Sequence, residues 1–169
     1  VRNLKDEELL LAIRRAHSRR KAFVLAFWQT PCMPETALGR VKAVAQGLPP
    51  NTRIAMLGDD DLLSIGFAQL GFSVTALDID PLLKDFLTQE AVRQEVNLQA
   101  EIYDLLGPVP KDLLGAFDVV VTDPLSFPTG FRAFMGRAAA LVKKGGKVWS
   151  ALHPIARRIV PEAIQTLPL

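Results

Sequence analysis

Cysteine and histidine are scarce in this sequence, which has one cysteine and two histidines in 169 residues. A lone Cys32 excludes a disulfide framework and a zinc site built from several cysteines. With only His17 and His153 available, any metal site would depend mainly on carboxylates, and we predict no metal. No apolar run is long enough to cross a bilayer, and no signal peptide is visible. The sequence therefore predicts a cytoplasmic protein that does not enter a membrane.

Net charge is also low, at +2. This balance gives no reason to expect nucleic acid as a partner. Basic residues do cluster in segment 14–21, but a solvated helix face explains them better than an anion-binding patch. Hydrophobic residues make up 49% of the chain and charged residues 22%, which is typical of one globular domain. The composition is compatible with a homodimer.

Apolar segments and helical patterns alternate from residue 51 onward. Apolar segments that begin near residues 53, 73, 97, 117 and 147 predict strands, with helices between most of them. Strands joined through helices form a parallel sheet that is covered on both faces. We therefore predict an α/β fold with a Rossmann-like, doubly wound, mainly parallel sheet.

The first 50 residues have a different pattern. Residues 4–26 predict one helix, residues 28–34 a loop that contains prolines, and residues 36–46 a second helix. We expect 1–50 to be an N-terminal helical segment with a loop, and 51–169 to be the Rossmann-like, cofactor-binding catalytic domain. The last predicted strand lies close to the C-terminal end, which suggests that the natural domain is longer than this chain.

Carboxylates follow four of the predicted strands. In an open parallel sheet, ligands bind beyond the carboxyl ends of the strands, so we expect these side chains to converge. Any one of them could equally cap the helix that follows it. Together they gather like charges, which is costly unless a cationic ligand relieves the repulsion. They are Asp59, Asp60 and Asp61 after the first strand, Asp78 and Asp80 after the second, Asp104 after the third and Asp123 after the fourth.

Gly58 and Asp78 have the spacing of a nucleoside site. A carboxylate that ends the second strand, about 20 residues after the glycine loop, can accept both ribose hydroxyls of an adenosine. Asp104 lies where the same architecture often contacts the adenine. Three aspartates follow Gly58 in place of a phosphate-binding glycine run, and they would repel the phosphates of NAD, FAD or ATP. A sulfonium nucleoside carries no phosphate and fits this loop better.

Three segments resemble a known family. Residues 54–80, IAMLGDDDLLSIGFAQLGFSVTALDID, resemble the nucleotide-binding segment of the branched-chain polyamine synthases, the aminopropyltransferases that make N4-branched polyamines. Residues 117–141 resemble the catalytic strand, loop and helix of that family, and residues 29–40 are similar to the stretch before its catalytic domain. The motifs at Asp78 and Asp123 are shared with S-adenosylmethionine-dependent methyltransferases. The resemblance thus implies a sheet of the class I methyltransferase type.

The resemblance also implies an activity: transfer of an aminopropyl group from decarboxylated S-adenosylmethionine to a small-molecule polyamine such as spermidine. Aspartates 59–61 would attract the donor's ammonium and repel the carboxylate of intact S-adenosylmethionine. Asp123 is the candidate to accept the proton that the attacking amine must lose. The predicted catalytic residues are Asp60, Asp61 and Asp123; the cofactor-binding residues are Gly58, Asp59, Asp78, Ile79 and Asp104; the substrate-binding residues are Gln29, Asp80 and Pro124.

Two alternatives stay open. The first is an S-adenosylmethionine-dependent methyltransferase, which shares the fold, Asp78 and Asp123, although the acidic first loop counts against it. The second is a catalytically silent domain of this fold. In its favour, Leu125 follows Asp123 and Pro124 where the family usually has a second proline.

Overall fold

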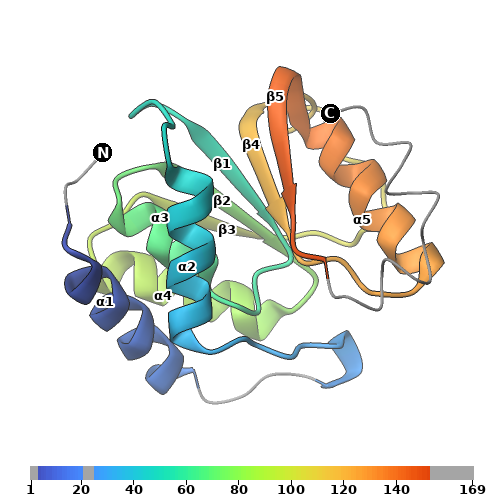
Figure 1. Ribbon diagram of the computed structural model, residues 1–169. Coiled ribbons are helices and arrows are strands. Elements are labelled where there is room, and N and C mark those ends of the chain that lie inside the picture. The colour runs from blue at the N-terminus through green and yellow to red at the C-terminus, as the bar shows by residue number, and fades with distance from the viewer. Residues whose placement is uncertain (1–3, 21–24, 153–169) are drawn as a thin grey trace.

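The computed structural model describes residues 4–20 and 25–152. Within these ranges the strands form a single parallel sheet in the order β3-β2-β1-β4-β5. This arrangement, shown in Figure 1, confirms the predicted α/β fold and its Rossmann-like parallel sheet. The strands are β1 (Arg53–Leu57), β2 (Ser73–Asp78), β3 (Leu98–Ile102), β4 (Phe117–Thr122) and β5 (Val142–Ser150).

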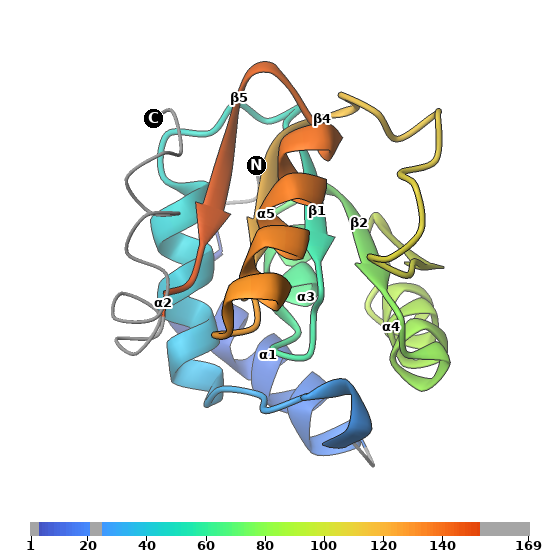
Figure 2. The ribbon, with the colours of Figure 1, turned by 90° about the vertical axis from the view of Figure 1, so that its right-hand side faces the viewer.

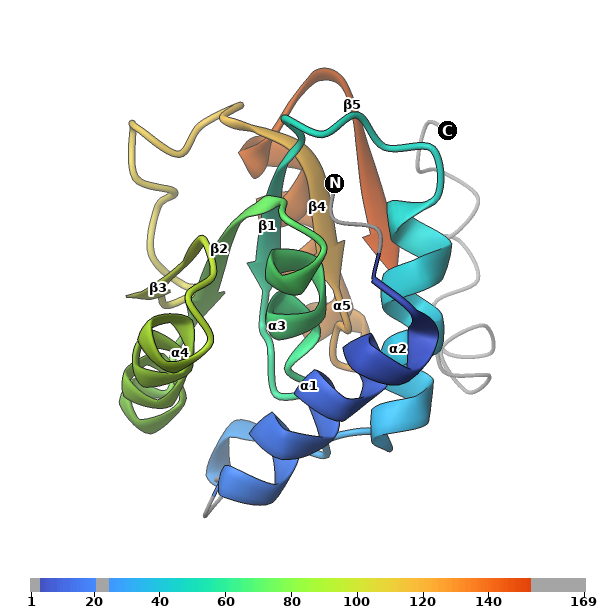
Figure 3. The same ribbon diagram turned by 90° about the vertical axis from the view of Figure 1, so that its left-hand side faces the viewer.

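Helices cover both faces of the sheet, because side chains of the central strands alternate between two apolar cores. On β1, Ile54 and Met56 enter the core on one face, whereas Ala55 and Leu57 enter the core on the other. One face carries α1 (Asp6–Arg19), α2 (Pro34–Ala45), α3 (Leu63–Gln69) and α4 (Pro81–Arg93), as Figure 3 shows. The other face carries α5 (Pro128–Leu141), which lies toward the viewer in Figure 2.

The helices differ from prediction mainly at their ends. α1 stops at Arg19 and Arg20 has an extended backbone, so one continuous helix over residues 4–26 was wrong. A short 3-10 helix follows at η1 (Leu25–Phe27). α2 begins at Pro34, inside the predicted loop, because proline at the first helical position has no backbone hydrogen bond to lose. α5 begins at Pro128 for the same reason.

The N-terminal helices pack on the sheet layer. Leu9 and Ile13 of α1 and Val41 of α2 share one core with Ile65 of α3. The predicted division of the chain at residue 50 stays a prediction. None of the helices in the described ranges is long and apolar enough to span a membrane.

The last strand starts earlier than predicted. β5 begins at Val142 and not near residue 147, and its pairing with β4 shifts register between Phe117 and Val119. Gly145 has φ 76°, a backbone conformation that favours glycine, at this irregularity. His153 lies outside the described residues.

Candidate active site

The register of three strands fixes the position of the site. Leu57 at the end of β1 pairs with Leu77 of β2 on one side and with Thr122 of β4 on the other. The Thr122 hydroxyl also donates a hydrogen bond of 2.7 Å to the carbonyl oxygen of Leu57. The residues that come next in the sequence are Gly58 after Leu57, Asp78 after Leu77 and Asp123 after Thr122. These three residues therefore meet at one edge of the sheet.

A pocket of about 420 Å³ opens at this edge. Gly58 forms part of its floor with φ 73°, and a Cβ added there would lie 3.3 Å from the Phe134 ring of α5. The Trp28 and Phe127 rings, 6.2 Å apart in an edge-to-face arrangement, also line it. Six predicted site residues contribute to its wall in addition to Gly58: Gln29, Asp60, Asp78, Ile79, Asp104 and Asp123.

The three aspartates after Gly58 occupy different environments. Asp59 is buried, lines neither pocket described here, and accepts weak hydrogen bonds from the Ser64 backbone N–H at 3.3 and 3.4 Å. Burial raises the pKa of its carboxyl well above the usual range. Asp61 is also buried and accepts a 2.6 Å hydrogen bond from the Cys32 backbone N–H. Of the three, Asp60 alone faces the large pocket.

The carboxyl group of Asp60 has a raised pKa. Burial, together with the neighbouring Asp61 carboxylate, raises its pKa to about 6, although the Thr30 backbone N–H opposes this by donating a 2.7 Å hydrogen bond. A carboxyl group with this pKa is mostly ionised at neutral pH and becomes neutral in mild acid. Asp60 can therefore attract a cation or take up a proton near physiological pH.

Asp78 lines the same large pocket, and two backbone N–H groups hold its carboxylate in place. Its Oδ2 accepts from the Asp59 N–H at 3.0 Å and its Oδ1 from the Asp80 N–H at 2.9 Å. Burial is the largest influence on the Asp78 carboxyl and raises its pKa. Each carboxylate oxygen has a second lone pair, so both can still accept a hydroxyl proton from a ligand.

Asp80 does not line the large pocket. It is buried, caps α4 by accepting from the Leu82 N–H at 2.8 Å, and accepts a second 2.8 Å hydrogen bond from the Gln29 side chain. Pro124 is buried as well, and neither residue is among those that line the two pockets. Their assignment to substrate binding stays a prediction. The helix-cap alternative for Asp80 is what the structure shows.

The remaining cofactor candidates are exposed. Asp104 accepts a 2.9 Å hydrogen bond from the Leu106 N–H, and Ile79 is 43% exposed. Both lie on the β2–β3 side of the large pocket. Their positions suit contacts with a flat, partly apolar group such as a purine ring.

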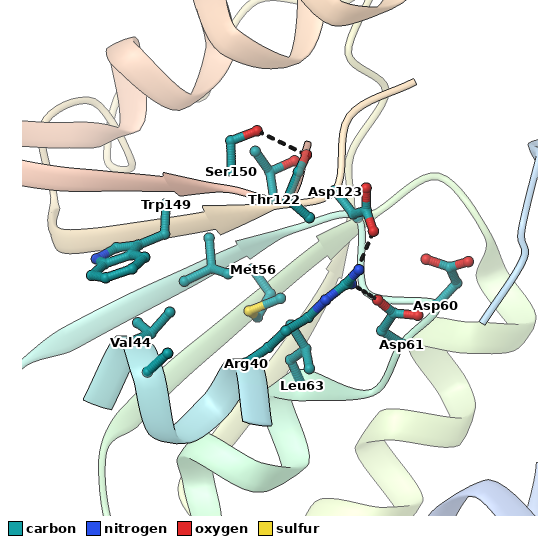
Figure 4. Close-up of a pocket in the computed structure, with 14 residues that line it drawn as sticks. Arg40, Val44, Met56, Asp60, Asp61, Leu63, Thr122, Asp123, Trp149 and Ser150 are labelled. Atoms are coloured by element: carbon teal, nitrogen blue, oxygen red, sulfur yellow. Dashed lines mark hydrogen bonds and ion pairs between the residues drawn. The ribbon is translucent and has the colours of Figure 1, made fainter. Parts of the chain in front are cut away.

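A smaller pocket of about 150 Å³ adjoins the large one, and Gly58, Asp60 and Asp123 line both. Figure 4 shows Arg40 of α2 reaching across this smaller pocket between two carboxylates. Its Nη1 donates to Asp123 Oδ2 at 2.9 Å and also contacts Asp61 Oδ2. The predicted repulsion among the aspartates is thus relieved in part by a residue of the chain itself.

Two arginines of segment 14–21 have specific partners within the protein. Arg20 donates to the Asp60 carbonyl oxygen at 2.5 Å and to Gln29 Oε1 at 2.9 Å. Arg19 pairs with Glu90, a buried carboxylate of α4, with Nε to Oε1 at 2.8 Å. The prediction of a solvated helix face was therefore wrong for these two residues.

Arg40 was missed altogether, although the sequence contains a signal for it. It lies three residues after Ala37 and four before Val44, both of which are buried on α2. An arginine beside the buried face of a helix needs a partner, because unpaired buried charge is costly. Only the placement of α2 beside the sheet shows that Asp61 and Asp123 are the partners.

The chain has relatives among known proteins. Residues 8–153 match the model of the branched-chain polyamine synthase A C-terminal domain family. The N(4)-bis(aminopropyl)spermidine synthase of Thermus thermophilus is 35% identical over 116 residues, which cover 67% of this chain and 34% of the relative. That of Thermococcus kodakarensis is 35% identical over 126 residues, covering 71% of this chain and 35% of the relative. The chain thus spans about a third of the length of these curated relatives.

Solved structures show the same relationship. The Thermus thermophilus branched-chain polyamine synthase C9 mutein, in complex with N4-aminopropylspermidine and 5′-methylthioadenosine, has a TM-score of 0.77 and 30% identity. The match covers 83% of this chain and 41% of that one. Coclaurine N-methyltransferase, at 14% identity, has a TM-score of 0.59 over 88% of this chain and 52% of its own, which shows that the sheet has the class I methyltransferase fold. The chain belongs to the branched-chain polyamine synthase family.

Proposed function

We propose that this chain carries the site of an aminopropyltransferase that uses decarboxylated S-adenosylmethionine as donor and a polyamine such as spermidine as acceptor. The observation that carries the proposal is the pair Asp60 and Asp123, which line both pockets and so stand where a donor and an acceptor would meet. Family membership and the ligands named for the Thermus thermophilus mutein support the same reaction.

The large pocket suits the nucleoside part of the donor. Asp78 retains acceptor capacity on both carboxylate oxygens for ribose hydroxyls, and Ile79 and Asp104 offer contacts to the base. The Trp28 and Phe127 rings would cover an apolar ligand and exclude water. Asp60 then lies near the group that is transferred, where its negative charge favours an ammonium over a carboxylate.

The donor would supply a carbon activated by the adjacent sulfonium. Asp123 accepts the proton of the acceptor ammonium, and the freed nitrogen lone pair forms a bond to that carbon. The carbon–sulfur bond breaks with its electron pair going to sulfur, which leaves methylthioadenosine and an alkylated ammonium. Positioning of the nitrogen in line with the breaking bond, through Asp60 and Asp123, supplies the rest of the catalysis.

Product analysis tests this proposal. The full-length protein is incubated with spermidine and either decarboxylated or intact S-adenosylmethionine, and the amines are identified by mass spectrometry. Aminopropylated spermidine from the decarboxylated donor is the expected product. Methylated amines from the intact donor would support the methyltransferase alternative, and no product from either would support a silent domain.

A further inference from the structure

The inference concerns the charge balance beside Asp123. Among the described residues that line the two pockets, Arg40 is the only cationic side chain. Its guanidinium contacts Asp123 and Asp61 with the same nitrogen, and its side chain is 32% exposed. Asp60 lines the same small pocket, so one positive charge stands among three carboxylates.

The Cys32 thiol, which lies near Arg40, adds no charge. Cys32 lies in the loop before α2, and burial together with the Asp61 carboxylate raises the pKa of its thiol to about 12. The thiol is therefore neutral at physiological pH. The strand side of the small pocket contributes Met56, Val121 and Trp149, which carry no charge. Arg20 lines neither pocket, but its positive charge lowers the pKa of Asp60. Within the small pocket, the charge that an incoming amine meets is set by three aspartates and Arg40.

A purely acidic site would bind a polyamine well and alkylate it poorly. Carboxylates close to an amine favour its protonated form, and an ammonium has no lone pair with which to attack. A nearby positive charge has the opposite effect from a carboxylate: it favours loss of the proton, both from an ammonium and from a carboxyl group. The site needs enough negative charge to collect the polyamine and not so much that the reacting nitrogen keeps its proton.

We propose that Arg40 is a positioning and specificity-determining residue: it holds the Asp123 carboxylate in place and limits the negative charge that the reacting amine meets. This inference rests on the proposed function. Loss of a purely structural ion pair would change polyamine affinity and turnover in the same direction, or would leave both unchanged. Arg40 weakens the binding of the polyamine and speeds the reaction of the bound polyamine.

The Arg40→Gln variant tests both effects. Without the guanidinium, we expect spermidine to bind about tenfold more tightly and turnover at neutral pH to fall about tenfold, as for the loss of one charge near a partly exposed site. The rising limb of the pH dependence of kcat should move upward by about one pH unit, because the amine and Asp123 both hold their protons more strongly. Arg40→Lys keeps the charge, so its spermidine affinity, turnover and pH dependence should lie close to those of the parent.

The same helix offers a matched control. Lys42 of α2 forms an exposed ion pair with Asp6 of α1 and lines neither pocket. Lys42→Gln removes the same charge from the same helix and should alter neither spermidine affinity nor the pH profile. Titration calorimetry of the full-length protein with spermidine, and steady-state rates with decarboxylated S-adenosylmethionine, give the measurements. Weaker spermidine binding by Arg40→Gln would overturn the proposal. So would a rising limb of the pH dependence of kcat that lies at the same pH as in the parent.

A second background covers the case in which Arg40→Gln does not fold, since it leaves buried Asp61 short of a partner. In Asp61→Asn that buried charge is absent, so Arg40→Gln is added to it and the two proteins are compared. The double variant should bind spermidine more tightly than Asp61→Asn, and the rising limb of its pH dependence of kcat should lie at higher pH. Equal values in the two proteins would refute the role of Arg40.

The binding measurement also separates this inference from the proposed function. If the parent transfers no aminopropyl group, the proposed function fails. Tighter spermidine binding by Arg40→Gln alone would still show that Arg40 sets the polyamine affinity of the site, whereas unchanged binding in an active parent would reject the role of Arg40 and keep the transferase.

Discussion

The loop after β1 and the loop after β4 both bring aspartates to the same edge of the sheet, but they hold them differently. In the first loop, Asp59 and Asp61 are buried and accept hydrogen bonds from backbone N–H groups of Ser64 and Cys32. In the second loop, the Asp123 side chain is 42% exposed and contacts Arg40. The carboxyl groups of Asp59 and Asp61 are therefore engaged in contacts inside the protein, whereas Asp123 is accessible to a substrate.

The largest expected effect is on turnover, at Asp123. Asp123→Asn removes the proton acceptor, and we expect the rate of aminopropyl transfer to fall by on the order of 100-fold or more. Methylthioadenosine affinity should be nearly unchanged. Steady-state rates and titration calorimetry measure the two properties, with Asp112→Asn, an exposed aspartate before β4, as the control. A variant that keeps most of its rate would show that another group takes the proton.

The next effect is on stability and contrasts Asp61 with Asp60. Asp61→Ala removes the acceptor of the Cys32 N–H and one of the two carboxylates that contact Arg40. We expect the free energy of unfolding to drop by roughly 2 to 3 kcal/mol. Asp60→Asn keeps an acceptor for the Thr30 N–H and should cost less than about 1 kcal/mol. Urea denaturation followed by circular dichroism compares the two. Equal losses would contradict the different roles of the two aspartates.

Asp78 extends the comparison to the predicted cofactor-binding residues of the large pocket. Asp78→Ala should weaken methylthioadenosine binding by roughly 1 to 3 kcal/mol, the usual cost of losing hydrogen bonds to a charged group. Asp104→Ala, at an exposed position, should weaken it less. Titration calorimetry gives both values. Binding as tight as that of the parent in Asp78→Ala would mean that the ribose does not lie on this carboxylate.

The smallest effect is a pH dependence that belongs to Asp60. Its pKa of about 6 is above the ordinary value for aspartate, so the carboxyl is ionised above this pH and becomes neutral as the pH falls through it. Spermidine affinity should therefore decrease between neutral pH and pH about 5. Asp60→Asn should flatten this decrease. Calorimetry over a pH series provides the measurement, and an equally steep decrease in the variant would assign it to another group.

The sequence was sufficient for the sheet and for the residues that its register brings together. The apolar runs of β1 and β4 predict strands buried on both faces, and parallel register then places Gly58, Asp78 and Asp123 at one edge. Their convergence follows from local patterns alone, since each residue directly follows or ends a strand.

The charges that balance the aspartates could not be predicted in the same way. Arg40 reaches Asp123 only because α2 packs beside the sheet, and Arg20 reaches the Asp60 carbonyl only because its backbone leaves the helical conformation. Both contacts join residues far apart in the sequence. The separate environments of Asp59, Asp60 and Asp61 also depend on this packing, although the three stand side by side in the chain.

The most direct test of the central claim is a titration of the full-length protein with two donors. If Asp60 faces the group that is transferred, decarboxylated S-adenosylmethionine should bind more tightly than intact S-adenosylmethionine, and Asp60→Asn should reduce this preference because the repulsion of the carboxylate is lost. Tighter binding of the intact donor by the parent protein would contradict the assignment of this site to aminopropyl transfer.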